Sequence, residues 1–265
     1  MANIRYTNKL ATEYQRLYDS CVIRSNRFKE IDKIIDSLLK NRKRYEAVDD
    51  ALGIPWYFIA AIHNLESSRR FTRHLHNGDP LTARTRHVPA GRPRQGKPPF
   101  SWEESAVDAL KFKYLNRIKD WKLPRLLYEM ERYNGWGYRS YHPHVLSPYL
   151  WGFSTHYSRG KYVADGRWSD TVVSRQCGGG SLIRRLEERQ VIETWKKTKP
   201  KRPYLHHSNR KLKRADDLQR FLNTFPDIYL RVDSNPGNKT SEAFKKVFGF
   251  YMEGDSRSSK RSKHK

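Results

Sequence analysis

The sequence contains few cysteines, no long apolar run and too few acidic residues to balance its basic ones. Cys21 and Cys177 are the only cysteines among 265 residues, which excludes a disulfide-stabilised scaffold. One bridge between them is an open alternative, but we expect two buried free thiols. No segment approaches the ~18 apolar residues of a membrane span. The sequence therefore predicts no membrane insertion.

The N-terminal segment lacks the pattern of a secretory signal. Arg5 and Lys9 supply positive charge, but no apolar stretch of ~7–15 residues follows them. We therefore expect the protein to stay in the cytoplasm where it is made. If its target lies outside the cytoplasm, another agent must deliver it.

The deficit of acidic side chains gives the chain its most informative property. Against 53 Lys and Arg stand only 28 Asp and Glu, a formal net charge of +25. Residues 196–214 and 256–265 hold 14 of the basic residues, so most of the positive charge belongs to the folded parts. Such a surface favours a polyanion: nucleic acid, an acidic membrane or an anionic cell-wall polymer.

The apolar pattern predicts a mainly α protein of two unequal domains. Hydrophobic residues make up 37% of the chain and aromatic residues 13%, which favours folding over disorder. No strand pattern is found before residue 190. We expect a helical first domain over 1–190, with 1–45 as an N-terminal extension. A basic linker over 191–214, a small domain over 215–255 and a basic tail over 256–265 follow.

Several local signals mark where helices begin and end. Pro55 suits a first helical turn, and the apolar run WYFIAAIHNLE after it is typical of a core helix. Ser101 and Glu104 have the spacing of a capping box, and we assign Glu103 to capping as well. Residues 77–100 are rich in Gly, Pro and Arg and predict a long surface loop.

A carboxylate at the end of the core helix is the main candidate for chemistry. Ile59 and Ile62 precede Glu66 by seven and four positions, which places all three on one helix face. Desolvation on an apolar face favours the neutral carboxyl group and raises its pKa. Such a group can donate a proton to a leaving oxygen, as glycoside hydrolysis requires. The alternative is a solvated Glu66 paired with Arg69 or Arg70.

The segments around Glu66 resemble the lysozyme-like superfamily of goose-type lysozymes and soluble lytic transglycosylases. In that family the catalytic Glu ends a buried helix and precedes Ser, as Glu66 precedes Ser67, and a later Tyr-Asn-x-Gly segment is matched by Tyr133-Asn134-Gly135. IAAIHNLESS, HLHNGDPLTART, PAGRP, PPFSWEESAVDAL, YNGWGYR and SPYLWGFSTHY resemble a phage and cyanobacterial group of lysozymes over about residues 45–185. The Gly-Leu-Met-Gln segment of the transglycosylases is absent, which leaves hydrolysis and transglycosylation both open.

The resemblance implies further site residues. Asp79 stands where goose-type lysozymes carry a water-activating Asp, although Asn-Gly-Asp-Pro is also a good turn. Tyr133 is expected to hydrogen-bond Glu66 and orient it, with a core tyrosine as the alternative. The expected substrate-binding residues are Ser67, His76, Trp102, Asn134, Trp136, Tyr149 and Trp151. The aromatic ones offer flat faces for sugar rings, although such residues more often belong to the core.

The histidines raise the question of a metal. His74 and His76 form a His-x-His pair near His63, a pattern that can bind zinc. No third ligand stands at a recognisable spacing, so we expect neither a metal nor another cofactor.

The small second domain resembles the type 1 peptidoglycan-binding domain. Leu218, Phe221, Leu222 and Phe225 predict one helical face; Ile228, Leu230 and Val232 predict an extended piece; Thr240 is expected to cap a helix whose Ala243, Phe244, Val247 and Phe248 point inward. The residues that match the family, and are expected to bind the wall, are Leu218, Asp233, Gly237 and Thr240. A helical hairpin packed on the first domain is the alternative.

These expectations together describe a monomeric muramidase that cuts the β-1,4 bond between N-acetylmuramic acid and N-acetylglucosamine. Its partners would be bacterial peptidoglycan and anionic wall polymers, and it would act as a phage endolysin held in the host cytoplasm, or as a virion-associated lysin. A lytic transglycosylase, an inactive wall-binding protein and a basic nucleic-acid-binding protein are the alternatives. No helix-turn-helix or zinc-finger spacing supports the last of these.

Overall fold

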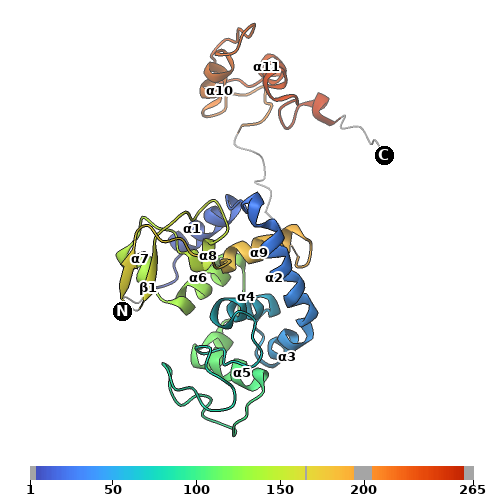
Figure 1. The fold of residues 1–265 in the computed structure, drawn as a ribbon. Helices are drawn as coiled ribbons and strands as arrows, with labels where there is room; N and C mark the ends of the chain where they lie inside the picture. The colour runs from blue at the N-terminus through green and yellow to red at the C-terminus, as the bar shows by residue number, and fades with distance from the viewer. Residues whose placement is uncertain (1–3, 165, 194–204, 260–265) are drawn as a thin grey trace. The chain divides into compact units, whose positions relative to one another are not determined.

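The computed structural model describes residues 4–164, 166–193 and 205–259, and these residues are mainly helical (Figure 1). The chain divides into two compact units, residues 1–195 and 196–265. The helices of the first unit are α1 (Asn8–Asp19), α2 (Phe28–Lys40), α3 (Arg42–Leu52), α4 (Trp56–Ser67), α5 (Trp102–Phe112), α6 (Leu123–Asn134), α7 (Gly137–Tyr141), α8 (Pro148–Trp151) and α9 (Gly179–Glu188). Short 3-10 turns occupy Ser25–Arg27 and Leu115–Arg117.

Helix α4 is the centre of the first unit. It contacts α3, α6 and α9, and all of its residues except Tyr57 and Glu66 are buried. Phe58, Ile59 and Ile62 are completely enclosed, and each buried side chain of this size contributes about 1.5–3 kcal/mol to folding. The all-round apolar pattern of residues 56–65 therefore correctly predicts a core helix, and Glu66 is its one acidic residue.

The predicted helix boundaries of the first unit are largely confirmed. Ser101 and Glu104 form the expected capping box at the start of α5. Gly135 ends α6 with a backbone φ of 95°, a conformation open to glycine. Glu103 differs from its assignment as a cap. Its carboxylate accepts hydrogen bonds of 2.6 and 2.9 Å from Arg44, and this ion pair joins α5 to α3.

A short antiparallel hairpin in the first unit was not expected. Strand β1 (Lys161–Ala164) pairs with β2 (Arg167–Ser169). Strands of four and three residues are too short to show a periodic apolar pattern. The Asp-Gly dipeptide at 165–166 is a hairpin signal in the sequence, and it is the feature that could have revealed the turn.

Both cysteines are free and buried, as expected. Among the described residues, no helix has both the length and the apolar composition needed to cross a bilayer.

The second unit begins earlier and ends later than the sequence predicts. Residues 205–214, expected to be linker, pack within it: the amides of His207, Ser208 and Leu212 donate to the carbonyls of Glu253, Pro236 and Ser234. A 3-10 turn at Ser256–Ser259 extends the fold into the expected tail. The basic composition of both segments predicted no folded structure. Their structure depends on backbone hydrogen bonds, which side-chain composition does not reveal. Residues 194–204 and 260–265 lie outside the described part of the chain.

Two helices, α10 (Ala215–Leu222) and α11 (Asn238–Phe248), form the second unit around a small core. Leu222, Ile228 and Ala243 are buried there. Phe221 and Phe248 were expected to point inward, but they are 47% and 43% exposed and stack on each other. Too little buried surface is available in a unit of this size to enclose every apolar residue of both helices.

The extended piece of the second unit forms no strand. The Asn223 side chain instead hydrogen-bonds both backbone groups of Leu230. It accepts from the Leu230 amide at 2.6 Å and donates to the Leu230 carbonyl at 2.8 Å. The segment is therefore fixed to the end of α10 by one side chain and has no β-ladder.

A buried glutamine organises the residues expected to bind the wall. The Gln219 amide nitrogen donates to Asp233 Oδ1, the Asn235 carbonyl and Thr240 Oγ1, and its oxygen accepts from the amides of Asp233 and Ser234. Thr240 lies inside α11 and is buried, so Gly237 takes the N-cap position in its place. Asp233 and Thr240 therefore hold the turn between the two helices.

Replacing Gln219 by Leu is expected to destabilise the second unit by about 2–4 kcal/mol, because the buried groups around it lose their partners. The loss is measured by thermal unfolding followed by circular dichroism, and by protease susceptibility of the region 205–259. The exposed neighbour Arg220→Leu serves as control and should change stability by less than about 0.5 kcal/mol. Equal stability of the two variants would contradict the central role of Gln219.

Candidate active site

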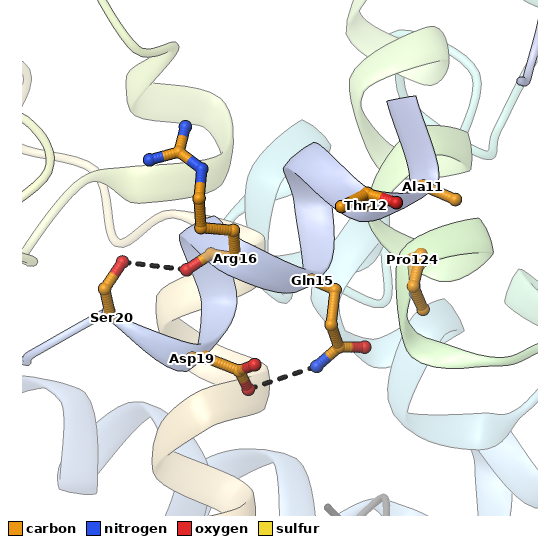
Figure 2. Close-up of a pocket in the computed structure, with 7 residues that line it drawn as sticks. All are labelled: Ala11, Thr12, Gln15, Arg16, Asp19, Ser20 and Pro124. Atoms are coloured by element: carbon orange, nitrogen blue, oxygen red, sulfur yellow. Dashed lines mark hydrogen bonds between the residues drawn. The ribbon is translucent and has the colours of Figure 1, made fainter. Parts of the chain in front are cut away.

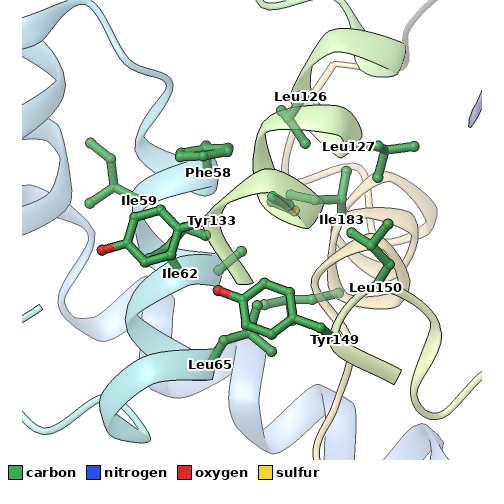
Figure 3. Close-up of a cluster of buried hydrophobic side chains, with 14 of the residues drawn as sticks. Phe58, Ile59, Ile62, Leu65, Leu126, Leu127, Tyr133, Tyr149, Leu150 and Ile183 are labelled. Atoms are coloured by element: carbon green, nitrogen blue, oxygen red, sulfur yellow. The ribbon is translucent and has the colours of Figure 1, made fainter. Parts of the chain in front are cut away.

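Helix α4 delivers Glu66 to the edge of the first unit's core. The helix ends at Ser67, one residue later, because Ser68 and Arg69 adopt left-handed backbone conformations, with φ of 52° and 64°. Figure 3 shows Ile59, Ile62 and Leu65 on α4 beside the rings of Tyr133 and Tyr149. Glu66 is only partly exposed and stands next to this apolar wall.

A hydrogen bond from Tyr149 fixes the Glu66 carboxyl group. The hydroxyl of Tyr149, from α8, donates to Glu66 Oε1 at 2.7 Å. Ser147 caps α8 by accepting from the Tyr149 amide, and the Tyr149 ring is buried. Burial raises the pKa of Glu66, while the Tyr149 hydrogen bond and the positive charge of Lys113 oppose the rise. The balance leaves the pKa above its usual value, as the sequence predicts.

Lys113 is the cationic group of this site. Its Nζ donates to the carbonyl of Tyr133 at 3.4 Å and lies 5.0 Å from the centre of the Tyr133 ring. Burial lowers the pKa of Lys113, and the Glu66 carboxylate counteracts this. Lys113 follows the end of α5, whereas Glu66 is the last residue but one of α4. Their approach joins two segments that lie 47 positions apart in the chain.

Tyr133 has a different partner from the one expected. Its hydroxyl donates to the carbonyl of Leu75 at 3.0 Å. The expected hydrogen bond to Glu66 comes from Tyr149, for which the sequence suggested sugar stacking. Tyr133 still lies near the site, because the Glu66 charge helps to raise its pKa. Burial is the larger cause of that rise and keeps the hydroxyl protonated.

Asp79 lies in the loop that packs against Glu66. A Cβ on the preceding residue, Gly78, would lie 3.4 Å from the Glu66 carbonyl oxygen. The Asp79 carboxylate accepts from His87 Nδ1 at 2.6 Å, from the amides of Arg86 and His87 at 2.8 and 3.0 Å, and from Asn77 Nδ2. These hydrogen bonds hold the pKa of Asp79 well below its usual value, against the effect of burial. A carboxylate so engaged is a weak base.

The histidines are engaged with protein groups. His76 Nε2 contacts Asp108 Oδ2 at 2.8 Å, and burial lowers the pKa of His76 to about 4. His74 bonds Ser105 Oγ and the Ala83 carbonyl, both at 2.8 Å. Among the described residues, no group of three His, Cys, Asp or Glu is arranged to hold a metal ion.

The other expected substrate-binding residues are mostly buried. Trp102 packs against Tyr45, His63 and Phe71, and is 1% exposed. Trp151 is equally enclosed, so neither indole can offer a ring face to a sugar in this structure. Of the other residues expected to bind substrate, Trp136 and Ser67 are buried, and Asn134 is exposed at the end of α6.

Two side chains at the site were not singled out from the sequence. Lys113 lies in an ordinary basic segment, and no local signal marks it. Gln176 donates from Nε2 to the Leu65 carbonyl at 2.6 Å and thereby fixes the last turn of α4. It precedes the Cys-Gly-Gly-Gly segment at 177–180, and that glycine run is the signal that could have drawn attention to it.

A separate groove of about 700 Å³ runs along α1 against Pro124 (Figure 2). Its polar side chains bond along the helix itself: Gln15 donates to Asp19 at 3.1 Å, and Ser20 donates to the Arg16 carbonyl at 2.8 Å. None of the residues expected to act in catalysis lines it, so Glu66 remains the candidate centre.

Comparisons with protein-family models, with curated proteins and with solved structures found no match for this chain.

If Glu66 is the general acid expected from the sequence, replacing Lys113 by Met moves the alkaline limb of the pH–activity profile to higher pH. Lys113 lowers the pKa of Glu66, so its removal lets that pKa rise further, and the acid form persists to higher pH. The measurement is the pH dependence of the initial rate of wall lysis. The exposed Lys111→Met has the same charge change and should leave the limb in place. A shift of the alkaline limb to lower pH would contradict the effect of the Lys113 charge on the pKa of Glu66.

Proposed function

We propose that the first unit cleaves the β-1,4 bond between N-acetylmuramic acid and N-acetylglucosamine in peptidoglycan, with Glu66 as general acid. The supporting observation is a carboxyl group on an apolar wall, with a raised pKa and an oriented hydrogen bond from Tyr149. A group of this kind carries a proton at a pH where an exposed carboxyl group has lost it. The resemblance in residues 45–185 supports the same choice of substrate.

The hydrogen bond to Tyr149 sets which oxygen carries the acidic proton. Tyr149 donates to Oε1, so a protonated Glu66 has its own proton on Oε2. Transfer of that proton to the glycosidic oxygen accompanies cleavage of the bond to the anomeric carbon, which develops positive charge. Glu66 is then a carboxylate, stabilised by Tyr149 and by the charge of Lys113. The positive charge of the chain would draw it to the carboxylates of the wall.

Transglycosylation is the second candidate, and the state of Asp79 favours it. Hydrolysis with inversion needs a second carboxylate to activate water, at a separation of about 6.5–9.5 Å from the acid. The Asp79 carboxylate is occupied by four hydrogen bonds within its loop. With the Asp79 carboxylate so engaged, the Glu66 carboxylate left after cleavage takes the proton of the muramic acid 6-hydroxyl. The 6-oxygen then bonds to the anomeric carbon and gives a 1,6-anhydro end.

The second unit is proposed to retain the enzyme on the wall, and the whole chain to act as an endolysin that reaches the wall after the membrane is breached. The support is the resemblance of residues 215–255 and the basic surface. Recovery of the protein from purified phage particles would instead favour a virion-associated lysin.

Mass spectrometry of digested peptidoglycan tests the reaction directly. Purified sacculi are incubated with the full chain, and the soluble products are analysed. Reducing-end muramic acid is the product of a hydrolase, and 1,6-anhydromuramic acid is that of a transglycosylase. Products cut only within stem peptides, or intact glycan after complete incubation, would contradict the proposal.

A further inference from the structure

A pocket of about 340 Å³ lies beside α4, away from the Glu66 carboxyl group. Asn64 lines it, and this residue precedes Glu66 by two positions, or about 200° around the helix. Residues of α2 and the segment 175–177 complete the wall. The pocket is therefore distinct from the candidate cleavage site, although Gln176 joins its wall to the last turn of α4.

Positive charge dominates the lining of this pocket. Lys33, Arg69 and Arg175 line it, and among the described residues no carboxylate stands within ion-pair distance of any of the three. Glu30 is the one acidic side chain of the lining, and it pairs with Arg27 at 2.7 Å. Burial raises the pKa of the Cys177 thiol, so this group adds no negative charge.

Asn64 is held as a hydrogen-bond donor to the pocket. The residue is 5% exposed, and its Oδ1 accepts from the Arg69 guanidinium. A guanidinium can only donate, which fixes the oxygen of the amide toward Arg69 and its nitrogen away from it. No hydrogen-bond partner is present for that nitrogen within the described structure. Because Asn64 lines the pocket, an acceptor that enters it can take a hydrogen bond from this nitrogen.

The backbone that carries Arg69 adopts a conformation that side chains other than glycine seldom take. Ser68 and Arg69 are consecutive and both have positive φ, and the Arg69 amide donates back to the His63 carbonyl at 3.2 Å. Non-glycine residues in this region are strained, and such strain is concentrated at binding and catalytic sites. Here it turns the Arg69 side chain back onto Asn64.

We propose that this pocket binds an oxyanion, a carboxylate or a phosphate, through Asn64 Nδ2 and the side chains of Lys33, Arg69 and Arg175. Its volume of about 340 Å³ leaves room for an oxyanion that is attached to a larger molecule. Guanidinium groups bind both kinds of oxyanion in a bidentate way. The proposal does not depend on the glycosidase function, because no step of it involves Glu66.

Titration of the full chain with two probes at constant ionic strength tests the site. Inorganic phosphate represents phosphate-bearing ligands, and N-acetylalanine represents peptide carboxylates. Binding is followed by calorimetry and by the NMR signal of the Asn64 side-chain amide. The test variant is Lys33→Gln with Arg175→Gln, both at exposed positions. The control, Arg16→Gln with Lys40→Gln, removes the same charge from exposed positions outside the pocket.

Saturable binding of either probe, weakened at least about tenfold in the test variant and less than about twofold in the control, is the expected result. Saturation by phosphate alone identifies a phosphate-bearing ligand, and saturation by N-acetylalanine alone identifies a carboxylate ligand. If probe affinity falls equally in both variants, the probes respond to the overall positive charge of the surface, and the proposed site is wrong. Absence of saturation by both probes up to about 10 mM would overturn it as well.

Discussion

Replacing Glu66 by Gln is expected to reduce wall lysis by about 10²–10⁴-fold, the usual contribution of a general acid. Glutamine has nearly the same shape, and its amide oxygen can accept the hydrogen bond from Tyr149. It has no acidic proton to give to the glycosidic oxygen. Lysis of purified sacculi is measured by turbidity at several pH values. The exposed Asp50→Asn makes the same chemical change and should retain full activity.

The same variant should fold at least as well as the native chain at neutral pH. Glu66 has a folded-state pKa above the usual 4.5, so its contribution to stability is complete below that value. The contribution is lost as pH rises through the raised pKa, because ionisation is then penalised by burial. Glutamine does not ionise and suffers no such loss. Native rates of lysis by Glu66→Gln would remove Glu66 from the mechanism, whereas loss of lysis with wall binding retained would support it.

Replacing Arg139 by Met is expected to destabilise the first unit by about 3–5 kcal/mol, because a buried carboxylate loses its counter-charge. Glu131 of α6 is 4% exposed and accepts from Arg139 Nε and Nη2 at 3.3 and 2.9 Å. Arg139 also pairs with Glu13 at 2.8 Å, and Tyr14 donates to Glu131. The cluster joins α1, α6 and α7 around one guanidinium group.

The measurement for Arg139→Met is urea unfolding followed by tryptophan fluorescence. Six of the seven tryptophans lie in the described part of the first unit and none lies in residues 205–259, so the signal reports mainly on the first unit. Lys122→Met breaks the exposed pair with Asp120, whose side chains are 78% and 63% exposed, and should cost less than about 1 kcal/mol. A midpoint for Arg139→Met that matches the control would show that water or another side chain compensates Glu131.

The amino-acid sequence alone determined the local structure of this protein. The core character of α4, the capping box at Ser101 and the end of α6 at Gly135 each depend on residues within about four positions of one another. The raised pKa of Glu66 was one of two interpretations of the sequence, because apolar residues at i−4 and i−7 lie on the same helix face as this residue. These features follow from helix geometry and need no knowledge of the remaining chain.

Only the tertiary structure decided which distant groups meet. Tyr149, 83 positions from Glu66, makes the hydrogen bond that the sequence assigned to Tyr133, and Lys113 brings its charge from another helix end. The family resemblance implied that the Asp79 carboxylate activates water, but in the structure it is hydrogen-bonded to His87. Choices of this kind depend on how helices pack and loops close. Chemically equivalent tyrosines and lysines compete for each position, and only their packing in the folded chain selects among them.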